Sequence, residues 1–419
     1  HLINSERFNN QILKFVTGTT RQRISRGNLA KLDVEVPPLD EQKRIAAILD
    51  KADSVRAGEE LDVSAVHNWL KGNISASSPS LEATIQSSDN LPQVTQYSGG
   101  ASNWTYCLDY QGSKQNQSEK TSLILRRAPA GTKAKGAHDM GREFRLQHAL
   151  KPVYRYVPEM LGLCEDESVI GTEFYVMEKF TGVIPRKNLP KGLNTSEQQT
   201  KQLCTNVLDS LIELHKVDYK KAGLEHLGKG AGYIERQISG WSERYSKAKT
   251  WNVPSGKKIM RWLENHMPAN ERICITHNDI RFDNVVLKPD NYTQIIGVLD
   301  WELATLGDPL MDLGNTLAYW VQADDDFLAQ STRRQPTHLP GMLTRKQVVA
   351  YYCKEMEIDV DDFTFYEVYG LFRLAGIAQQ IYYRYHHKQT KNPAFKNFWI
   401  FIHYLMWRCN KAIKASGKR

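Results

Sequence analysis

The sequence predicts an α+β protein in which a small β-rich lobe precedes a larger, mainly helical lobe. In the first lobe, expected over residues 91–184, short apolar runs such as 122–127 are typical of strands. In the second, expected over residues 185–415, apolar residues recur at helical spacing in long segments. Within that second region, polar residues directly follow two short apolar runs, which indicates a site built at strand ends.

Composition and charge limit the possible classes. The chain has 419 residues, with 41% hydrophobic and 24% charged residues, as in ordinary globular proteins. The formal net charge of +8 favours anionic partners, and nucleotides, coenzyme phosphates, nucleic acids and acidic membranes all qualify. Six cysteines occur without CxxC spacing, so neither a zinc site nor a disulfide framework is indicated. We expect buried thiols in a cytoplasmic protein.

A membrane partner is not expected. The most apolar segment, residues 398–407, is about half as long as a membrane span and contains His403, which predicts a buried helix. No signal peptide is visible. The chain begins at His1 rather than Met, so the sequence leaves its natural start open.

Residues 1–58 differ in pattern from the rest of the chain. A short strand is expected at 34–36, ended by two prolines, and Asp40 is suited to cap the amphipathic helix that follows. The stretch 59–90 is expected to be a linker, because residues 72–90 are rich in Ser, Asn and Thr and lack periodicity.

Two parts of this N-terminal segment, Phe15–Thr20 and Val36–Ile45, resemble the C-terminal end of a type I restriction enzyme specificity subunit. In that family, a target-recognition domain finishes here and a long spacer helix begins. The resemblance covers about the first 57 residues. We interpret residues 1–58 as a remnant of such a subunit and do not expect nucleic acid as the partner; DNA binding by this segment is the alternative.

A glycine pair, Gly99 and Gly100, lies between two short predicted strands. Glycine allows backbone amides to approach phosphate oxygens, because no Cβ stands in the way. We therefore assign this pair, together with Ser102 and Asn103, to cofactor binding. A hairpin turn is the alternative explanation of such a pair on its own.

The strand at 122–127 ends in two arginines, and strand alternation puts Arg126 and Arg127 on opposite faces. Arg126 occupies the place where the third strand of kinases carries a phosphate-binding lysine, and arginine binds phosphate bidentately. Glu143 opens the next helix and is expected to pair with Arg126, as a glutamate pairs with the lysine in kinases. A solvated strand end and an ordinary charged helix face are the alternatives.

The strand at 174–180 is followed by a break at Gly182. In a kinase-like fold this segment is the hinge, and its backbone from Glu178 to Phe180 pairs with the adenine edge of the nucleotide. Taken alone, the segment is a buried strand.

The helical segments with the clearest apolar spacing after it are 203–215, 366–385 and 398–409.

The segment from His277 to Asn284 places Asp279 four intervening residues before Asn284, which is the spacing of the kinase catalytic loop. Asp279 is expected to orient the substrate hydroxyl and accept its proton. A second apolar strand, 295–299, leads to Asp300. Asn284 and Asp300 are expected to bind Mg²⁺, which prefers oxygen ligands. Phosphoryl transfer needs little more than an aligned hydroxyl and cations over the phosphates, so these residues suffice for it.

Neighbouring residues are given supporting roles. His277 is expected to hydrogen-bond backbone near Asp300 rather than to act as an acid or base. Arg281 is assigned to catalysis through contact with phosphate or substrate, with bracing of the loop as an equal alternative. Asp283 is expected to be a solvent-exposed loop carboxylate.

A helix is expected soon after Asp300. Asp308 precedes Pro309, which suits the first helical position, so Asp308 is a candidate N-cap. Asp312, one turn later, is expected to bond backbone amides of the catalytic loop.

Taken in order, these segments resemble the aminoglycoside phosphotransferase family of small-molecule kinases. More narrowly, they are similar to the kinase-like domain that some proteins carry joined to an acyl-CoA dehydrogenase. Asn278 stands where the family has glycine, which asparagine tolerates at positive φ, and Arg126 replaces lysine, as is familiar in the narrower branch. The resemblance spans roughly residues 90–415 and is carried by 100–105, 125–126, 142–144, 277–284 and 299–309.

This resemblance implies a two-lobed protein-kinase-like fold, ATP and Mg²⁺ as cofactors, and phosphate transfer to a hydroxyl group. For the narrower branch it implies a hydroxyacyl-CoA or hydroxy acid as the acceptor. An aminoglycoside or macrolide kinase is one alternative, although cationic aminoglycosides call for an acidic pocket and this chain is basic. An inactive nucleotide-binding scaffold is another, and the presence of Asp279, Asn284 and Asp300 argues against it. The acceptor and the oligomeric state stay open.

Overall fold

The computed structural model describes residues 59–74, 81–82, 85–86, 91–97, 103–111, 121–129, 139–190, 193 and 195–417. The strand and helix expected within residues 1–58, and the expected cofactor contacts of Gly99, Gly100 and Ser102, lie outside the described residues. The chain divides after Glu60 into two compact units. The fold described below belongs to the second unit, Leu61–Arg419.

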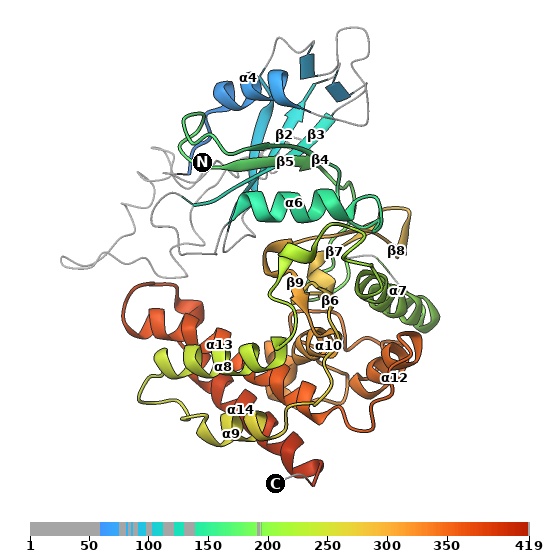
Figure 1. The fold of residues 1–419 in the computed structure, drawn as a ribbon, viewed down its shortest axis with the longest axis vertical. Helices are drawn as coiled ribbons and strands as arrows, with labels where there is room; N and C mark the ends of the chain where they lie inside the picture. The colour runs from blue at the N-terminus through green and yellow to red at the C-terminus, as the bar shows by residue number, and fades with distance from the viewer. Residues whose placement is uncertain are drawn as a thin grey trace, which may run out of the picture. The chain divides into compact units, whose positions relative to one another are not determined.

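A five-stranded antiparallel sheet forms the smaller lobe of this unit (Figure 1). Its strands lie in the order β1-β2-β3-β5-β4, which makes β3, the strand that carries Arg126, the central one. Branched and aromatic side chains are frequent in these strands, which suits a pleated surface packed on both faces. The strands are β1 (Gln93–Tyr97), β2 (Trp104–Tyr110), β3 (Thr121–Arg127), β4 (Met160–Cys164) and β5 (Phe174–Glu178).

Helix α6 (Met140–Leu150) covers one face of the sheet and packs against β4 and β5. It begins after Asp139, whose carboxylate accepts a hydrogen bond from an amide of the first turn at 2.7 Å. The buried side chains of Ile124 and Met140 belong to the apolar cluster between helix and sheet. Because side chains alternate along a strand, Arg126 lies on the same face as Ile124.

Helix α4 (Val63–Asn73) covers the opposite face of the sheet (Figure 1). The ring of Trp69 packs edge-on against Phe174, with the ring centroids 5.0 Å apart. The sheet is therefore enclosed between two helices, as burial of both its faces requires.

The linker predicted over residues 59–90 is wrong over 63–73. Val66 and Leu70, one helical turn apart, are fully buried, and Asp62 caps the helix with its side chain. These two apolar residues close the open face of the sheet. The Ser- and Asn-rich sequence that follows obscured this short amphipathic segment.

Two short strand pairs belong to the larger lobe and carry the polar residues singled out above. Strand β6 (Cys274–Thr276) pairs with β9 (Thr305–Gly307), and β7 (Val285–Lys288) pairs with β8 (Asn291–Val298). His277 directly follows β6, and Asp300 follows β8 by two residues. Both residues therefore stand at strand ends, as the sequence predicts.

Helices form the remainder of the larger lobe (Figure 1). The helices predicted at 203–215, 366–385 and 398–409 lie within α7, α13 and α14. Among the described residues, none of the helices has the length and apolar character to cross a bilayer. The helices are α7 (Glu197–His215), α8 (Tyr233–Lys247), α9 (Lys257–Asn265), α10 (Pro309–Ala318), α11 (Phe327–Thr332), α12 (Arg345–Glu355), α13 (Thr364–His386) and α14 (Phe398–Ala415).

Helices α10 and α13 touch through two glycines. A Cβ added to Gly370 would lie 2.1 Å from the carbonyl oxygen of Gly314, and one added to Gly314 would lie 2.4 Å from the carbonyl oxygen of Tyr366. No side chain fits between these backbones. Helix α10 itself begins at Asp308, the predicted N-cap, whose Oδ1 accepts hydrogen bonds from two amides of the first turn at 3.0 Å. The glycine contact sets the position of α13 relative to α10.

Gly370→Ala is expected to lower the free energy of unfolding by about 1–3 kcal/mol, because an added methyl group forces the two helices apart. Chemical denaturation of wild type and variant measures the difference. Gly72→Ala in α4 is the matched control, since no atom lies within 4 Å of the added Cβ. The control should leave stability unchanged or raise it by up to about 1 kcal/mol. Equal stabilities of the two variants would contradict the close contact.

Candidate active site

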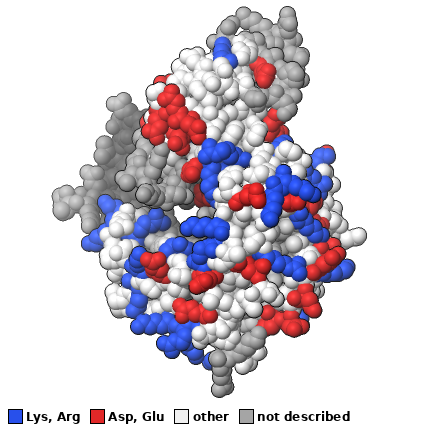
Figure 2. All heavy atoms as spheres, in the orientation of Figure 1, with Lys and Arg blue, Asp and Glu red and all other residues white. Residues whose placement is uncertain are grey.

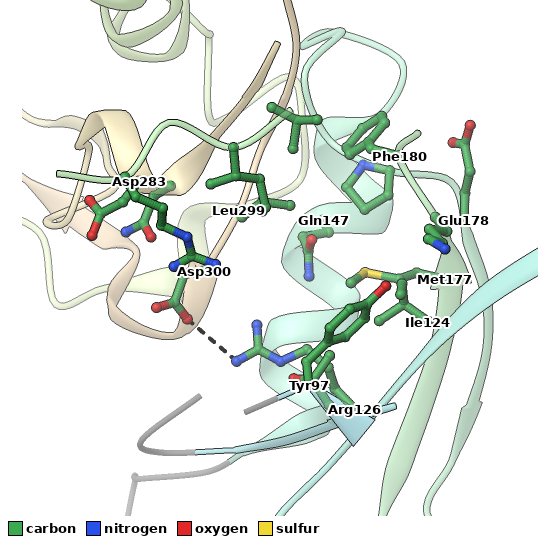
Figure 3. A pocket seen from close by; sticks show the side chains of 17 residues that line it. Tyr97, Ile124, Arg126, Gln147, Met177, Glu178, Phe180, Asp283, Leu299 and Asp300 are labelled. Carbon is green, nitrogen blue, oxygen red and sulfur yellow. Dashed lines mark hydrogen bonds and ion pairs between the residues drawn. The ribbon is translucent and has the colours of Figure 1, made fainter. Parts of the chain in front are cut away.

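A cavity of about 460 Å³ lies between the two lobes (Figure 3). Its apolar wall includes Ile124 and Met177 of the sheet and Leu299 of the larger lobe. Figure 3 shows Arg126 and Asp300 facing each other at one end of it. An apolar wall with a charged end suits a ligand that joins a flat ring to an anionic chain.

The predicted hinge residues line this cavity, but the protein itself uses their side chains. The carboxylate of Glu178 accepts a hydrogen bond from the amide of Glu159 at 3.1 Å. The ring of Phe180 packs on Gly297 so closely that a Cβ there would lie 2.4 Å from it. The amide of Glu178 also bonds to the carbonyl oxygen of Glu159 at 2.9 Å, so the backbone of Lys179 and Phe180 is the part left to meet a ligand, and its pairing with an adenine edge stays a prediction.

Arg126 stands in a cluster of carboxylates drawn from both lobes. Its Nη1 lies 2.7 Å from Oε1 of Glu143, so the predicted ion pair forms. Its Nη2 lies 3.4 Å from Oδ1 of Asp300 and 3.8 Å from Oε2 of Glu302. Burial acts to lower the pKa of the guanidinium, but Glu143 and the other acidic groups raise it above its ordinary value. Arg126 is therefore a fixed cation at the end of the cavity.

The catalytic loop brings Asp279 and Asn284 into contact. Nδ2 of Asn284 donates to the backbone oxygen of Asp279 at 2.8 Å and to its Oδ2 at 2.9 Å. This orientation leaves the amide oxygen of Asn284 for another partner. Asn284 and Asp300 both line the cavity and supply oxygen ligands of the kind that Mg²⁺ prefers, so the residues present fit that cation.

Arg281 braces this loop. Its Nη2 lies 3.5 Å from Oδ2 of Asp279 and its Nε 3.2 Å from Oδ1 of Asp283, while its Cζ lies 4.8 Å from the ring centroid of Tyr319. The geometry favours bracing, and direct catalysis by Arg281 stays a prediction. Asp283, expected to be solvent-exposed, has a side chain only 19% exposed and lines the cavity. That expectation is wrong because the carboxylate pairs with Arg281.

A buried carboxylate of α10, Asp312, holds the loop from behind. Its Oδ2 accepts a hydrogen bond from the amide of His277 at 2.7 Å, and its Oδ1 accepts one from the amide of Asn278 at 2.9 Å. His215 Nε2 lies 3.1 Å from the same Oδ2. Burial acts to raise the pKa of Asp312, but the hydrogen bond from His215 and those from the loop lower it below its ordinary value. Asn278 has φ 65°, as expected where asparagine replaces glycine.

His277 has the structural role that the sequence predicts. Its Nδ1 accepts a hydrogen bond from the amide of Asp279 at 3.2 Å, and its Nε2 lies 3.1 Å from the carbonyl oxygen of Leu299. A neutral imidazole protonated at Nε2 satisfies both contacts. Burial lowers the pKa of the ring, which keeps it neutral. The ring thereby ties Asp279 to the strand end before Asp300.

Burial raises the pKa of Asp279 to about 6. The positive charges of Arg281 and Arg373 oppose this rise, whereas neighbouring carboxylates add to it. A carboxylate with a pKa near neutrality accepts a proton more readily than an ordinary aspartate.

Two residues that the sequence analysis did not single out complete the site. Glu302 of the short helix η3 (Trp301–Leu303) accepts a hydrogen bond from Nδ2 of Asn103 at 3.3 Å, which ties a predicted cofactor residue to the larger lobe. Arg142 donates to the backbone oxygen of Glu302 at 3.3 Å. The sequence signals were that Glu302 stands two residues after Asp300 and lies, like Arg142, in a segment that carries the family resemblance. Arg142 reaches the backbone oxygen of Glu302 because helix α6 lies against η3 in the folded structure, which the sequence pattern does not indicate.

Comparison with known proteins identifies the family. The model of the phosphotransferase enzyme family matches residues 93–345, and the model of the type I restriction modification DNA specificity domain matches residues 3–60. Acyl-CoA dehydrogenase family member 10 of Mus musculus is 35% identical over 294 residues, or 70% of this chain and 26% of that protein. Family member 11 of Homo sapiens is 32% identical over 330 residues, or 78% of this chain and 40% of that protein. The chain thus spans well under half the length of these curated relatives.

Solved structures share the fold. A Ralstonia eutropha protein, solved as a candidate aminoglycoside phosphotransferase, is 26% identical, with a TM-score of 0.69 over 85% of this chain and 99% of that one. Choline kinase from Cryptosporidium parvum is 12% identical, with a TM-score of 0.57 over 85% of this chain and 97% of that one. The second likeness shows the fold alone. Together they confirm the predicted two-lobed, kinase-like architecture.

Asp312→Ala is expected to lower the free energy of unfolding by about 3–5 kcal/mol, because two loop amides and His215 lose a buried acceptor. Asp312→Asn retains one acceptor oxygen and should have a smaller effect. Denaturant titration of both variants measures this. Asp359→Ala, at an exposed position, is the control, and an equal loss of stability in Asp312→Ala and Asp359→Ala would refute the role of Asp312.

Proposed function

The chain belongs to the phosphotransferase enzyme family and is a kinase of small-molecule hydroxyl groups, and on that premise we propose that it transfers the γ-phosphate of ATP to a hydroxylated acid or acyl-CoA. The observation that carries the proposal is the placement of Asn284 and Asp300 at one end of the cavity, opposite Arg126, with the carboxylate of Asp279 bonded to Asn284 at 2.9 Å. A hydroxyl held at Asp279, and phosphates held at Arg126 and by the cation that Asn284 and Asp300 would bind, are the two requirements of phosphoryl transfer.

The cavity supports ATP as the phosphate donor. Ile124, Met177 and Leu299 offer an apolar surface for the adenine ring, and Arg126 offers a fixed cation for phosphate oxygens. Asn284 and Asp300 are the proposed ligands of Mg²⁺. When bound there, Mg²⁺ supplies positive charge that neutralises the phosphate oxygens during transfer.

Asp279 is the proposed catalytic residue at the acceptor. Its carboxylate orients the hydroxyl and takes its proton as the phosphate arrives. Asn284 and Arg281 hold it from two sides, at 2.9 Å and 3.5 Å from Oδ2. A fixed carboxylate positions the hydroxyl without further reorganisation, which is how such sites lower the barrier.

The acceptor class rests on charge and on the relatives. The relatives reported above are named as acyl-CoA dehydrogenase family members, and the chain carries a net charge of +8, which favours an anionic acceptor. An aminoglycoside kinase is the alternative that the Ralstonia structure suggests by its description, but a polycationic acceptor fits a basic chain poorly. An inactive scaffold is disfavoured by the intact set Asp279, Asn284 and Asp300.

Surface charge, the N-terminal similarity and the cysteines bear on the partners and the compartment of the protein. On the face shown in Figure 2, basic and acidic side chains are interspersed over the helical lobe, a poor match for a nucleic acid backbone. The similarity of residues 3–60 to a DNA specificity domain gives that segment a second candidate function, which a salt-dependent mobility shift with duplex DNA tests. All six cysteines are free thiols, which supports a reducing, cytoplasmic compartment.

ATP-dependent phosphorylation should be detected with hydroxy acids or hydroxyacyl-CoAs in a panel that also holds aminoglycosides, macrolides and amino alcohols. Asp300→Ala should abolish it, because a proposed ligand of Mg²⁺ and a partner of Arg126 are lost together. Radiolabelled γ-phosphate in the product is the measurement. Transfer to an aminoglycoside alone would overturn the acceptor class, and transfer that survives Asp300→Ala would overturn the site.

Asp279→Asn is expected to lower kcat by at least about 10²-fold, the usual contribution of a positioned acid–base group. ATP binding should survive, because Asp279 is not among the described residues that line the cavity. Calorimetric titration with ATP, beside turnover, separates the two effects. Loss of ATP binding in Asp279→Asn would count against the assigned role.

The turnover of the wild-type enzyme should rise with pH through about 6, because Asp279 must be ionised to accept a proton and burial raises its pKa to about 6.

The same shift in the pKa of Asp279 predicts an effect on the stability of the fold. A folded-state pKa above the ordinary 3.8 means that the contribution of Asp279 to stability is present below about pH 4 and is lost as pH rises through about 6. At pH 7.5, Asp279→Asn should therefore not lower the melting temperature. A kcat independent of pH between 5 and 7, or a marked drop in melting temperature, would contradict this assignment.

A further inference from the structure

Helix α13 carries an arginine, Arg373, that is buried without a partner. The residue is 5% exposed. Within the part of the chain that the structure describes, its guanidinium makes no hydrogen bond and no ion pair. A buried cation that lacks both is costly unless something binds to it. The nearby Arg281, by comparison, has two carboxylates within 3.5 Å.

Packing holds Arg373 in place. Its Cζ lies 5.4 Å from the ring centroid of Trp241 on α8, within range of a cation–π contact. That ring lies against α13, since a Cβ on Gly376 would be 3.0 Å from it. Arg244, an exposed residue of α8, lies over the same ring at 4.1 Å. Two cations therefore gather around one indole, which raises the local positive potential.

The charge of the guanidinium acts on the residues of the proposed acceptor end of the site. Its charge opposes the burial-driven rise in the pKa of Asp279 and, in the same way, that of the buried phenols Tyr233 and Tyr319. These neighbours already have partners. Tyr233 donates to Oδ1 of Asn278 at 3.3 Å, and Tyr319 lies beneath Arg281. Neither phenol carries a charge to pair with Arg373, and the Asp279 carboxylate forms its ion pair with Arg281 rather than with Arg373.

A purely structural role explains this arrangement poorly. An arginine kept for stability normally binds carboxylates or carbonyl oxygens. An arginine kept only as the counter-charge of Asp279 would duplicate Arg281, which already lies 3.5 Å from that carboxylate. What remains is a buried cation that has no hydrogen bond or ion pair among the described residues and whose charge acts on the proposed catalytic base.

We propose that Arg373 binds an anionic group of the phosphate acceptor, a carboxylate or a phosphate, while the acceptor hydroxyl lies at Asp279. The proposal deepens the proposed function and rests on it. It assigns the choice of acceptor to charge: an acidic acceptor completes the pairing of a buried guanidinium, whereas a polycationic acceptor such as an aminoglycoside meets like charge at the same place. Free hydroxy acids supply the anion as a carboxylate, and hydroxyacyl-CoAs supply it as a coenzyme phosphate.

Steady-state kinetics on the full chain tests this with a matched acceptor series. The series is 3-hydroxybutyrate, its neutral amide and its CoA thioester, each with ATP and Mg²⁺, on wild type, Arg373→Met and Arg384→Met. Arg384 is an exposed arginine of the same helix, about three turns further on, and serves as the matched control. Arg373→Met should raise the KM for the anionic acceptors about 10- to 100-fold, as expected for a lost hydrogen bond between charged groups. The KM for ATP and for the amide should not change.

The series also separates the two sources of the anion. A KM that rises only for 3-hydroxybutyrate identifies the carboxylate, and one that rises only for the thioester identifies a coenzyme phosphate. An equal loss of kcat on all three acceptors, with a shifted pH profile, would show that Arg373 only tunes Asp279 and would overturn the proposal.

Binding without turnover keeps the two proposals distinct. Thermal shift with each acceptor in the absence of ATP should show stabilisation of wild type and Arg384→Met by the anionic acceptor, and none of Arg373→Met. Without any acceptor, Arg373→Met should lower the melting temperature only slightly, because the cation–π contact with Trp241 is lost but no hydrogen bond or ion pair is. If wild type transfers no phosphate to any compound, the proposed function fails, and this binding comparison still decides on Arg373. Equal stabilisation of Arg373→Met and wild type, or no stabilisation of either, would overturn the proposal.

Discussion

The catalytic loop depends on one buried interaction, the acceptance of two successive backbone hydrogen bonds by the carboxylate of Asp312. The amides of His277 and Asn278 point at this carboxylate at 2.7 and 2.9 Å, which turns the chain so that Asp279 leaves the loop toward the site. A left-handed residue is required at that turn, and Asn278 provides it with φ 65°. His215 adds a third contact from α7. Because an ionised carboxylate without such donors would be strongly disfavoured in the interior, the loop and its support stabilise each other.

A second constraint joins the two lobes. Arg126 comes from the sheet of the smaller lobe, whereas Asp300 and Glu302 come from the larger one, and Glu143 fixes the guanidinium from α6. Arg142 and Asn103 both reach Glu302 as well. These contacts cross the cavity at the end where phosphates are proposed to bind. The geometry of the nucleotide site is therefore linked to the relative position of the lobes. An anionic ligand would compete with these carboxylates for the guanidinium of Arg126.

Charge is distributed unevenly around Asp279. Arg281 braces the carboxylate from its own loop, while Arg373 stands nearby on α13 and has no counter-ion among the described residues. The glycine contact between α10 and α13 makes this possible, since it brings the helix of Arg373 against the helix of Asp312. The same packing that supports the loop thus also delivers the cation proposed to select the acceptor.

Local patterns determined much of this protein. Strand alternation separated Arg126 from Arg127, which packs over Trp104 with its Cζ 4.7 Å from the ring centroid, and the spacing around Asp279 placed Asn284 beside it, because short-range geometry follows from the backbone itself. Tertiary structure alone decided the rest. It showed that residues 63–73 form a helix against the sheet, that Asn103 and Arg126 of the smaller lobe reach Glu302, and that Arg373 of α13 is buried without an ion pair among the described residues. These features arise where segments far apart in the sequence meet, and no local period or spacing records which side chain will find a partner there and which will remain without one.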